Sequence, residues 1–584
     1  MASQTPRHVA QPRSEDQHAA AFSQLSLFES ESVEVLPASL EEVQQVFIAG
    51  EALEEPFSKE QEEISALPQP EQEARQVSAS PPDMAVFPEP CMLAWPFASP
   101  PEPLARAIER CVARLSGSSI GGSRDAGFWQ LVYLLCAKQA EERHAKEWPK
   151  RFFTNQKEAK KEQGAQSIAE RILPLFEQVK TAYPGLFSEG ETLQLQASTL
   201  APLVLALCDQ DLFGSELDPF GAAYQQWAGA RAREWRAQFF TPLGVAYFVV
   251  SLLQPQAQER VLDASCGAGV FFRALQTYRR YYLSGMAALL EEAGHSIPAE
   301  ELQQELTAYM RSCVYGADLD GTLIRLARLQ LSLLDGDPEH VYHMDSLAFP
   351  QEAEASVQEQ IPQGSLDLIV GNPPYSLPVT DPAILGRYEL ARVWKRRGET
   401  GWMPTDQLQR SVPTEVLFLE QALNWLKPGG RMALVVPESL LSNPGTTYAR
   451  YWLMKHAYLL ASISLPGETF QAQSHTGVHT GVLVLRKMTA AELEEEEKAS
   501  RNYSIFMAVA ERVGYDSRGR TIYARTPDGE LLHRAGERQV DNDLPAILAS
   551  FWRFQTSGEV DPPLPALEAP IEPSKDDSNP LEAS

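Results

Sequence analysis

Apolar residues in the first part of the chain recur at the spacing of amphipathic helices. Positions i, i+3, i+4 and i+7 lie on one face of an α-helix, so apolar residues at this spacing mark a buried stripe. Three such stripes occur, at 128–136, 168–176 and 200–207. Residues 96–232 are therefore predicted to form an N-terminal helical domain, and they contain no visible catalytic motif.

After Thr241 the pattern changes to short apolar runs separated by helical stretches. Such runs, bounded by turn residues, are typical of strands buried on both faces. The predicted strands are 260–264, 314–318, 366–370, 431–436, 460–465 and 481–486. Helical periodicity fills the intervals, including a long insertion at 276–311. This alternation predicts a doubly wound, Rossmann-like α/β domain over residues 233–490.

The two ends of the chain lack such periodicity. Residues 1–95 are rich in Ser, Gln, Glu and Pro, which predicts a disordered acidic arm. Residues 491–556 are expected to form a small C-terminal appendix, and 557–584 a disordered tail.

Charge is concentrated in these ends. The formal net charge is −28, and residues 1–100 hold 17 acidic but only 4 basic side chains. The central body is thus mildly acidic, and it can still present a local basic surface to a nucleic acid. No apolar run reaches the roughly 18 residues of a membrane span, and no signal segment is visible, so a cytoplasmic protein is expected. The six cysteines include no C-x-x-C pair, so no metal site is expected.

One motif dominates the candidate chemistry, Asn372-Pro373-Pro374-Tyr375. Two prolines end the strand at 366–370, because neither can donate to a strand ladder. The Asn372 amide oxygen and the Pro373 carbonyl can accept both hydrogens of an exocyclic amine, and Tyr375 can stack on a planar base. The alternative is a strand-terminating turn with a packing tyrosine.

A second motif runs from strand 260–264 through a glycine-rich turn into a helix. Gly267 and Gly269 allow close approach of a ligand, and Asp263 precedes them. Phe272 stands where a dinucleotide-binding loop would have its third glycine, so that class is disfavoured. Asp318 ends the next strand, where it can accept hydrogen bonds from two ribose hydroxyls.

Two further positions allow two interpretations each. Asp345 can bind an adenine amine or cap a helix N-terminus. Thr241 can hold an amino-acid carboxylate, or it can cap a helix that has Pro242 at its first position.

Together these segments resemble the N6-adenine DNA methyltransferases of the gamma class. The motifs occur in that class's order: F-x-T-P at 239–242, D-x-x-C-G-x-G at 263–269, G-x-D-x-D at 316–320 and N-P-P-Y at 372–375. The segments 218–224, 426–431 and 465–470 are similar to the modification subunit of type I restriction systems. Ala264 and Ala237 depart from the usual proline and glycine.

The resemblance implies S-adenosylmethionine as cofactor and adenine in double-stranded DNA as substrate. Thr241 would then bind the methionine carboxylate, and Asp263, Gly267 and Gly269 would lie at the methionine portion. Asp318 would take the ribose and Asp345 the adenine of the cofactor. Asn372, Pro373, Pro374 and Tyr375 would form the catalytic clamp on the target amine, with Phe470 on the other side of the base.

Other substrates for the same motif are a protein glutamine amide or an RNA adenine, and a non-catalytic scaffold is a further alternative. A separate DNA-specificity subunit is expected, because sequence readout needs a dedicated surface that this chain does not show. A nuclease or translocase subunit is a further expected partner. The basic cluster 387–397 is expected to contact the DNA backbone, or else to be a solvated helix face.

Overall fold

The computed structural model describes residues 95–97, 100–116, 124–236, 240–292, 296–398, 401–474, 477–498, 503–534 and 536–557. The predicted acidic arm, apart from Trp95, and nearly all of the predicted tail lie outside these residues. Within the described residues, no helix is long and apolar enough to cross a membrane.

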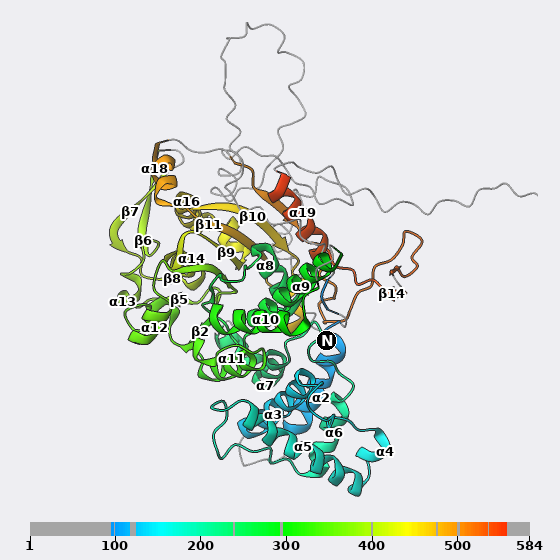
Figure 1. Ribbon diagram of the computed structural model, residues 1–584. Coiled ribbons are helices and arrows are strands. Elements are labelled where there is room, and N and C mark those ends of the chain that lie inside the picture. Colours follow the sequence, from blue (N-terminus) through cyan, green and yellow to red (C-terminus); the bar gives the residue numbers. More distant parts are fainter. Residues whose placement is uncertain are drawn as a thin grey trace, which may run out of the picture.

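The predicted helical domain is confirmed. Its helices are α2 (Glu102–Ser116), α3 (Arg124–Arg143), α4 (Gln156–Ala159), α5 (Glu162–Ala182), α6 (Ala197–Leu207) and α7 (Pro219–Arg236). The predicted stripes are buried in one shared core, which also takes in Leu323, Leu326, Leu329 and Leu333 of α11 (Gly321–Leu333). The helical domain therefore packs against the sheet domain through α11, below the sheet in Figure 1.

A single large sheet confirms the doubly wound prediction. Its order is β12-β10-β11-β9-β4-β1-β2-β3. The strands are β1 (Val261–Asp263), β2 (Val314–Asp318), β3 (Val341–His343), β4 (Leu366–Gly371), β9 (Leu426–Pro437), β10 (Ala457–Leu465), β11 (Thr480–Lys487) and β12 (Phe506–Val509). In the described sheet, β11 is the strand that runs antiparallel to both its neighbours.

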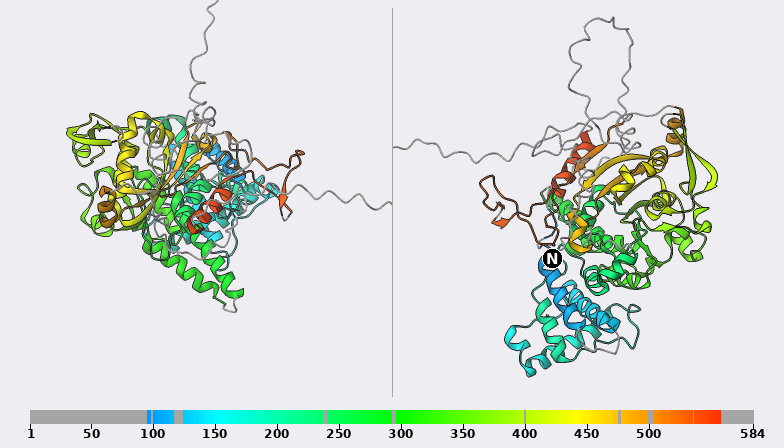
Figure 2. Two further views of the ribbon diagram at one scale, coloured as in Figure 1. Left: turned by 90° about the horizontal axis from the view of Figure 1, so that it is seen from above. Right: turned by 180° about the vertical axis from the view of Figure 1, so that it is seen from behind.

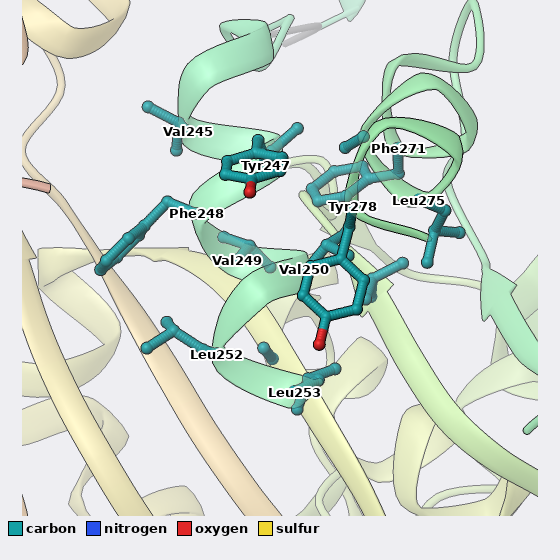
Figure 3. Close-up of a cluster of buried hydrophobic side chains, with 14 of the residues drawn as sticks. Val245, Tyr247, Phe248, Val249, Val250, Leu252, Leu253, Phe271, Leu275 and Tyr278 are labelled. Carbon is teal, nitrogen blue, oxygen red and sulfur yellow. The ribbon is translucent and has the colours of Figure 1, made fainter. Parts of the chain in front are cut away.

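Helices cover both faces of the sheet because its strands are apolar on both faces. On one face lie α8 (Leu243–Leu253), α9 (Val270–Glu292), α10 (Ala299–Cys313) and α19 (Leu544–Ser557). Figure 3 shows Tyr247 of α8 beside Phe271 of α9, whereas Phe248 projects from the opposite side of α8 within the same cluster. On the other face lie α14 (Thr414–Trp425) and α16 (Thr447–His456). Neighbouring residues such as Val261 and Leu262 point into these opposite cores, as the two-residue period of a strand requires.

The remaining short helices cap or connect these elements. They are η1 (Pro338–His340), η2 (Ser346–Ala348), α12 (Ala355–Gln360), α13 (Pro382–Leu385), α15 (Glu438–Ser442), η3 (Pro444–Thr446), α17 (Glu468–Ser474) and α18 (Ala490–Lys498).

The segment expected as a separate appendix at 491–556 is largely part of this fold. β12 pairs in parallel with β10, and α19 packs on α8, where the Trp552 indole donates to the Ser251 carbonyl at 3.2 Å. The sheet therefore continues past the boundary predicted at residue 490. The part that stands away from the sheet carries the small hairpin β13 (His533–Arg534) and β14 (Glu537–Arg538), as Figure 2 shows.

An insertion of irregular structure separates β4 from α14. It contains the pair β5 (Pro378–Val379) and β8 (Val412–Pro413), and a hairpin of β6 (Arg392–Arg397) and β7 (Gly401–Leu408). The alternative interpretation of cluster 387–397 as a helix face is therefore wrong. The chain forms a two-stranded ribbon there, with Trp394 opposite Pro404 and Arg396 opposite Trp402.

Candidate active site

Most of the predicted site residues lie at the carboxyl ends of three adjacent strands. In the register of the sheet, Asp263 of β1 lies between Gly316 of β2 and Val370 of β4. The glycine loop, Asp318 and the Asn372 motif follow directly from these strand ends. Open α/β sheets bind their ligands at this edge. Segments more than a hundred residues apart in the chain therefore form one site.

The glycine loop takes backbone conformations that side chains rarely adopt. Gly267 has φ +55° and Gly269 has φ +93°. A Cβ on Gly269 would lie 2.8 Å from the Phe272 ring. On Gly267, the nearest atom to an added Cβ would be in the Phe240 ring, at 3.9 Å, so this side of the loop has room for a ligand. Glycine is thus required at 269 by packing and favoured at 267 by conformation.

The Phe272 ring explains why position 316 is a glycine, for which the sequence offered no reason. A Cβ on Gly316 would collide with the Phe272 ring, which fills the space between the loop and β2. The residue that argued against a dinucleotide-binding loop is thus a packing element beneath the site. The contact joins positions 44 apart in the chain, so no local pattern could predict it.

Asp318 holds the loop as well as facing the site. Its Oδ2 accepts a hydrogen bond from the Gly267 backbone N–H at 3.0 Å, and its Oδ1 accepts one from the Asp320 N–H at 2.9 Å. Asp320 in turn caps α11 by accepting from the N–H groups of Thr322 and Leu323. Hydrogen bonds to a charged carboxylate are stronger than neutral ones, so Asp318 fixes the glycine loop on β2.

Asp263 is buried between the loop and the clamp. Its side chain is 2% exposed, and its Oδ1 accepts from the Ser265 N–H at 3.1 Å. Burial is the main cause that raises the pKa of this carboxyl to about 8, where the Ser265 hydrogen bond opposes the shift and the neighbouring Asp318 carboxylate adds to it. A Cβ on Gly371 would come within 3.0 Å of Asp263 Oδ1. Gly371 therefore lets the strand that carries the clamp approach the glycine loop closely.

The clamp loop holds itself in shape. The Tyr375 hydroxyl donates to the Asn372 side-chain oxygen, and burial keeps the pKa of Tyr375 well above its usual value, so this hydroxyl stays protonated. The Pro374 carbonyl accepts from the Thr414 hydroxyl at 2.7 Å. Among the described residues, no donor reaches the Pro373 carbonyl. The Pro373 carbonyl therefore remains as an acceptor for an amine hydrogen.

Two residues at the start of α14 support the clamp, and the sequence did not predict this role for them. Thr414 binds the Pro374 carbonyl, and Glu415 Oε2 accepts from the Ser376 N–H at 2.8 Å, where Ser376 has φ +56°. Burial raises the pKa of Glu415, although its hydrogen bonds oppose this shift. Both residues begin a helix about 40 positions downstream of the clamp, so their roles depend on tertiary contact.

Thr241 and Asp345 border the same edge. Helix α8 begins at Leu243 with Pro242 as its N-cap, so the interpretation of Thr241 as the cap is wrong by one residue. Thr241 itself is buried, and its neighbour Phe240 lies beside Gly267. Asp345 does cap η2 by accepting from the Leu347 N–H at 2.9 Å. It also lies close to the end of β2, because the Met344 N–H donates to the Asp318 carbonyl.

Tyr375 and Phe470, the two aromatic residues predicted to contact the target base, lie in different surroundings. Tyr375 is part of the clamp but is 3% exposed. Phe470 of α17 is 1% exposed and belongs to the core around α8 and α9, so it has no open face toward a base. The assignment of Phe470 to the target base stays a prediction.

The aspartate of the segment 218–224 has a structural role. Asp218 accepts from the N–H groups of Phe220 and Gly221 at 3.1 and 2.9 Å, at the start of α7. Burial raises its pKa to about 6, and the buried Arg273 guanidinium opposes this shift. It therefore fixes the start of α7.

A glycine loop and an Asn-Pro-Pro-Tyr clamp at neighbouring strand ends of a doubly wound sheet are typical of amino-methyltransferases. Residues 215–512 match the family model for N-6 DNA Methylase, which is half of the chain. The chain therefore belongs to the N-6 DNA methylase family.

Several known proteins are similar to this chain. The type I restriction enzyme StySPI methylase subunit of Salmonella potsdam is 24% identical over 376 residues, which are 61% of this chain and 64% of that protein. The EcoKI methylase subunit of Escherichia coli K12 is 24% identical over 343 residues, 57% of this chain and 58% of that protein. The chain thus spans less than two thirds of these curated relatives.

Among solved structures, the type I restriction-modification methyltransferase subunit of Streptococcus thermophilus aligns at 18% identity with a TM-score of 0.38. The alignment covers 68% of this chain and 92% of that one.

Proposed function

We propose that this chain transfers a methyl group from S-adenosylmethionine to the N6 amine of adenine in DNA, as the modification subunit of a restriction-modification or related anti-phage defence system. The observation that carries the proposal is the close approach of β4 and β1 at their carboxyl ends. A Cβ added to Gly371, the residue before the clamp, would lie 3.0 Å from Asp263 Oδ1 and 3.6 Å from Ser265 Oγ, so a donor on the glycine loop and an acceptor in the clamp would be neighbours.

The glycine loop and the adjacent carboxylates fit the proposed cofactor. S-adenosylmethionine supplies, when bound, an electrophilic methyl group on a sulfonium. The open side of Gly267 would admit the methionine portion beside Asp263, and Thr241 would face its carboxylate. Asp318 would accept from the ribose hydroxyls, and Asp345 from the adenine amine. The partly exposed position of both aspartates is compatible with these roles.

The clamp would act on the acceptor. The lone pair of an adenine N6 amine is delocalised into the ring and is a poor nucleophile until the nitrogen becomes tetrahedral. The Asn372 oxygen and the Pro373 carbonyl would accept the two amine hydrogens and draw the nitrogen toward that geometry. Alignment with the donor supplies much of the remaining rate enhancement. Because the Tyr375 ring is buried, stacking on an extruded base requires the clamp loop to open.

The family supports DNA over the alternative substrates. A protein glutamine amide or an RNA adenine presents a similar planar amine, whereas the matched family is one of DNA methylases. A non-catalytic scaffold is disfavoured because every functional group of the predicted site is present. A separate specificity subunit and a nuclease or translocase subunit remain the proposed partners. Their support is that similar proteins are methylase subunits of type I restriction enzymes.

The test is methyl transfer from labelled S-adenosylmethionine to duplex DNA, RNA and a protein extract. The expected product is N6-methyladenine in DNA, present for the unaltered chain with its specificity partner and absent for Asn372→Ala. Label in glutamine or in RNA would assign one of the alternatives. Absence of transfer to all three, with cofactor still bound, would support the scaffold.

A further inference from the structure

The hairpin β6–β7 is a charged ribbon that stands apart from the main sheet. It occupies the middle of the insertion that begins directly after the clamp, at Ser376, and ends at α14. Figures 1 and 2 show it at the outer edge of the molecule, away from the helical domain. The hairpin is therefore accessible to a large partner.

Three consecutive cations in this hairpin have no acidic partner among the described residues. Lys395, Arg396 and Arg397 are exposed, and no described carboxylate lies within 4.0 Å of their charged nitrogens. Arg387, which belongs to the same sequence cluster, differs because it donates to the Ala348 carbonyl and pairs with Glu352 at 3.2 Å. In a chain of net charge −28, unpaired adjacent cations mark a surface suited to a polyanion.

Strand geometry divides these cations between two faces. Arg396 lies opposite Trp402, and its guanidinium sits 6.0 Å from the centre of that ring. Lys395 and Arg397 point to the other face, because neighbouring side chains of a strand alternate. Lys395 is opposite Met403, which is 44% exposed. The outward face thus carries Lys395 and Arg397.

The base of the hairpin is fixed to two helices, α16 and α14. Trp394 stacks on Tyr448 of α16 at 5.9 Å, and Gln409 donates to the Tyr448 hydroxyl at 3.1 Å. Glu420 of α14 accepts from the N–H groups of Glu389 and Leu390 at 2.9 and 2.8 Å.

The same helix, α14, holds the clamp through Thr414 and Glu415. The outward face of the hairpin therefore has a defined position relative to Asn372.

We propose that this hairpin binds the DNA backbone beside the extruded adenine, with Lys395 and Arg397 contacting phosphates. The inference rests on the proposed function and adds the surface that holds the duplex. A base leaves the stack at an energetic cost, and contacts to the flanking backbone can offset that cost. Arg396 supports the ribbon from its inner face.

The experiment measures binding of the full chain to a fluorescent duplex by anisotropy at several salt concentrations. Each phosphate contact contributes about 0.9 to the slope of log Kobs against log salt. The double substitution Lys395→Gln and Arg397→Gln should therefore reduce the slope by about 1.8. Arg396→Gln should change the slope by much less than the value of about 0.9 expected for one phosphate contact. An unchanged slope in the double variant would overturn the proposal.

A matched control removes the same charge elsewhere. Lys160 and Lys161 are exposed on the helical domain, between α4 and α5. Lys160→Gln with Lys161→Gln should leave the slope unchanged, and an equal reduction would show that net charge, and not the hairpin, is responsible. Cofactor affinity by calorimetry should be unaltered in both double variants, which establishes that they are folded.

The two proposals can fail separately. If the unaltered chain shows the hairpin-dependent slope but forms no N6-methyladenine with its partner, the proposed function fails and the DNA-binding surface stands. If it methylates adenine while the Lys395→Gln, Arg397→Gln variant keeps both its salt slope and its kcat/KM, the hairpin inference fails alone.

Discussion

Asp263 is expected to release a proton when the cofactor binds. In the free chain the carboxyl is buried and has a pKa raised to about 8, chiefly by burial. It is therefore mostly protonated at neutral pH. The amino group of the methionine portion would bring a positive charge beside it, which favours the carboxylate. Cofactor binding would then draw the proton from Asp263.

The size of the effect follows from the raised pKa. With a pKa of about 8, about nine in ten chains carry the proton at pH 7, so binding should release about 0.9 proton. Because the proton competes with the cofactor, affinity should rise by up to about tenfold per pH unit as the pH approaches 8 from below, and level off above pH 8.

The assay is isothermal titration calorimetry at pH 7 in buffers of different ionisation enthalpy. The slope of observed enthalpy against buffer ionisation enthalpy gives the number of protons released. Asp263→Asn keeps an acceptor for the Ser265 N–H but has no titrating proton. In this variant the release should fall close to zero, and the affinity should lose its pH dependence.

A second buried carboxyl provides the control. Burial raises the pKa of Glu420 to about 7, but this group binds the backbone of Glu389 and Leu390 in the insertion. Glu420→Gln should therefore retain the proton release of the unaltered chain. Undiminished release in Asp263→Asn, or no release at all in the unaltered chain, would refute the assignment of Asp263 to the cofactor site.

Three further predictions concern the clamp, the loop and the partner. Asn372→Ala should abolish methyl transfer while calorimetry shows cofactor affinity within a few-fold of the unaltered chain. Asp318→Ala should weaken cofactor binding by about 1.5–3 kcal/mol, because it also loses the hydrogen bond that holds Gly267. Equal losses of cofactor affinity in both variants would contradict this division. Glu415→Ala should lower kcat about tenfold or more without changing cofactor affinity. Glu415→Gln can still accept from the Ser376 N–H, so it should keep most of the kcat of the unaltered chain. An equal loss of kcat in both variants would show that the charge of Glu415 matters instead. The purified chain should bind cofactor but methylate no defined DNA motif until a specificity subunit is added, and modification of one motif at full rate by the chain alone would disprove the multisubunit proposal.

Much of the fold could be predicted from the sequence because its signals are local. The apolar run at Val314–Asp318 coincides with β2, since a buried strand needs an uninterrupted apolar stretch that ends at a turn. The helical stripes and the glycine turn are equally local. The two prolines of the clamp end β4 whichever strands lie beside it, because proline cannot donate to a strand ladder. These features depend on backbone propensity and periodicity, so they do not require knowledge of what packs nearby.

The secondary structure of the basic cluster could not be predicted from local patterns. Lys395–Arg397 carries no periodic apolar residues, so no local pattern could predict its secondary structure. Pairing with β7 makes it a hairpin. Strand pairing is decided by the partner strand.

Only the tertiary structure decided which residues support the site. β12 joins the main sheet through β10, and Gly316 is a glycine because the Phe272 ring fills the space beside it. Ser376 is held by Glu415, a residue on a helix that follows the whole insertion. Each contact joins residues distant in the chain, and its free energy arises from packing and burial that exist once the sheet has formed. The sequence determined the reacting groups, and the folded sheet determined their neighbours.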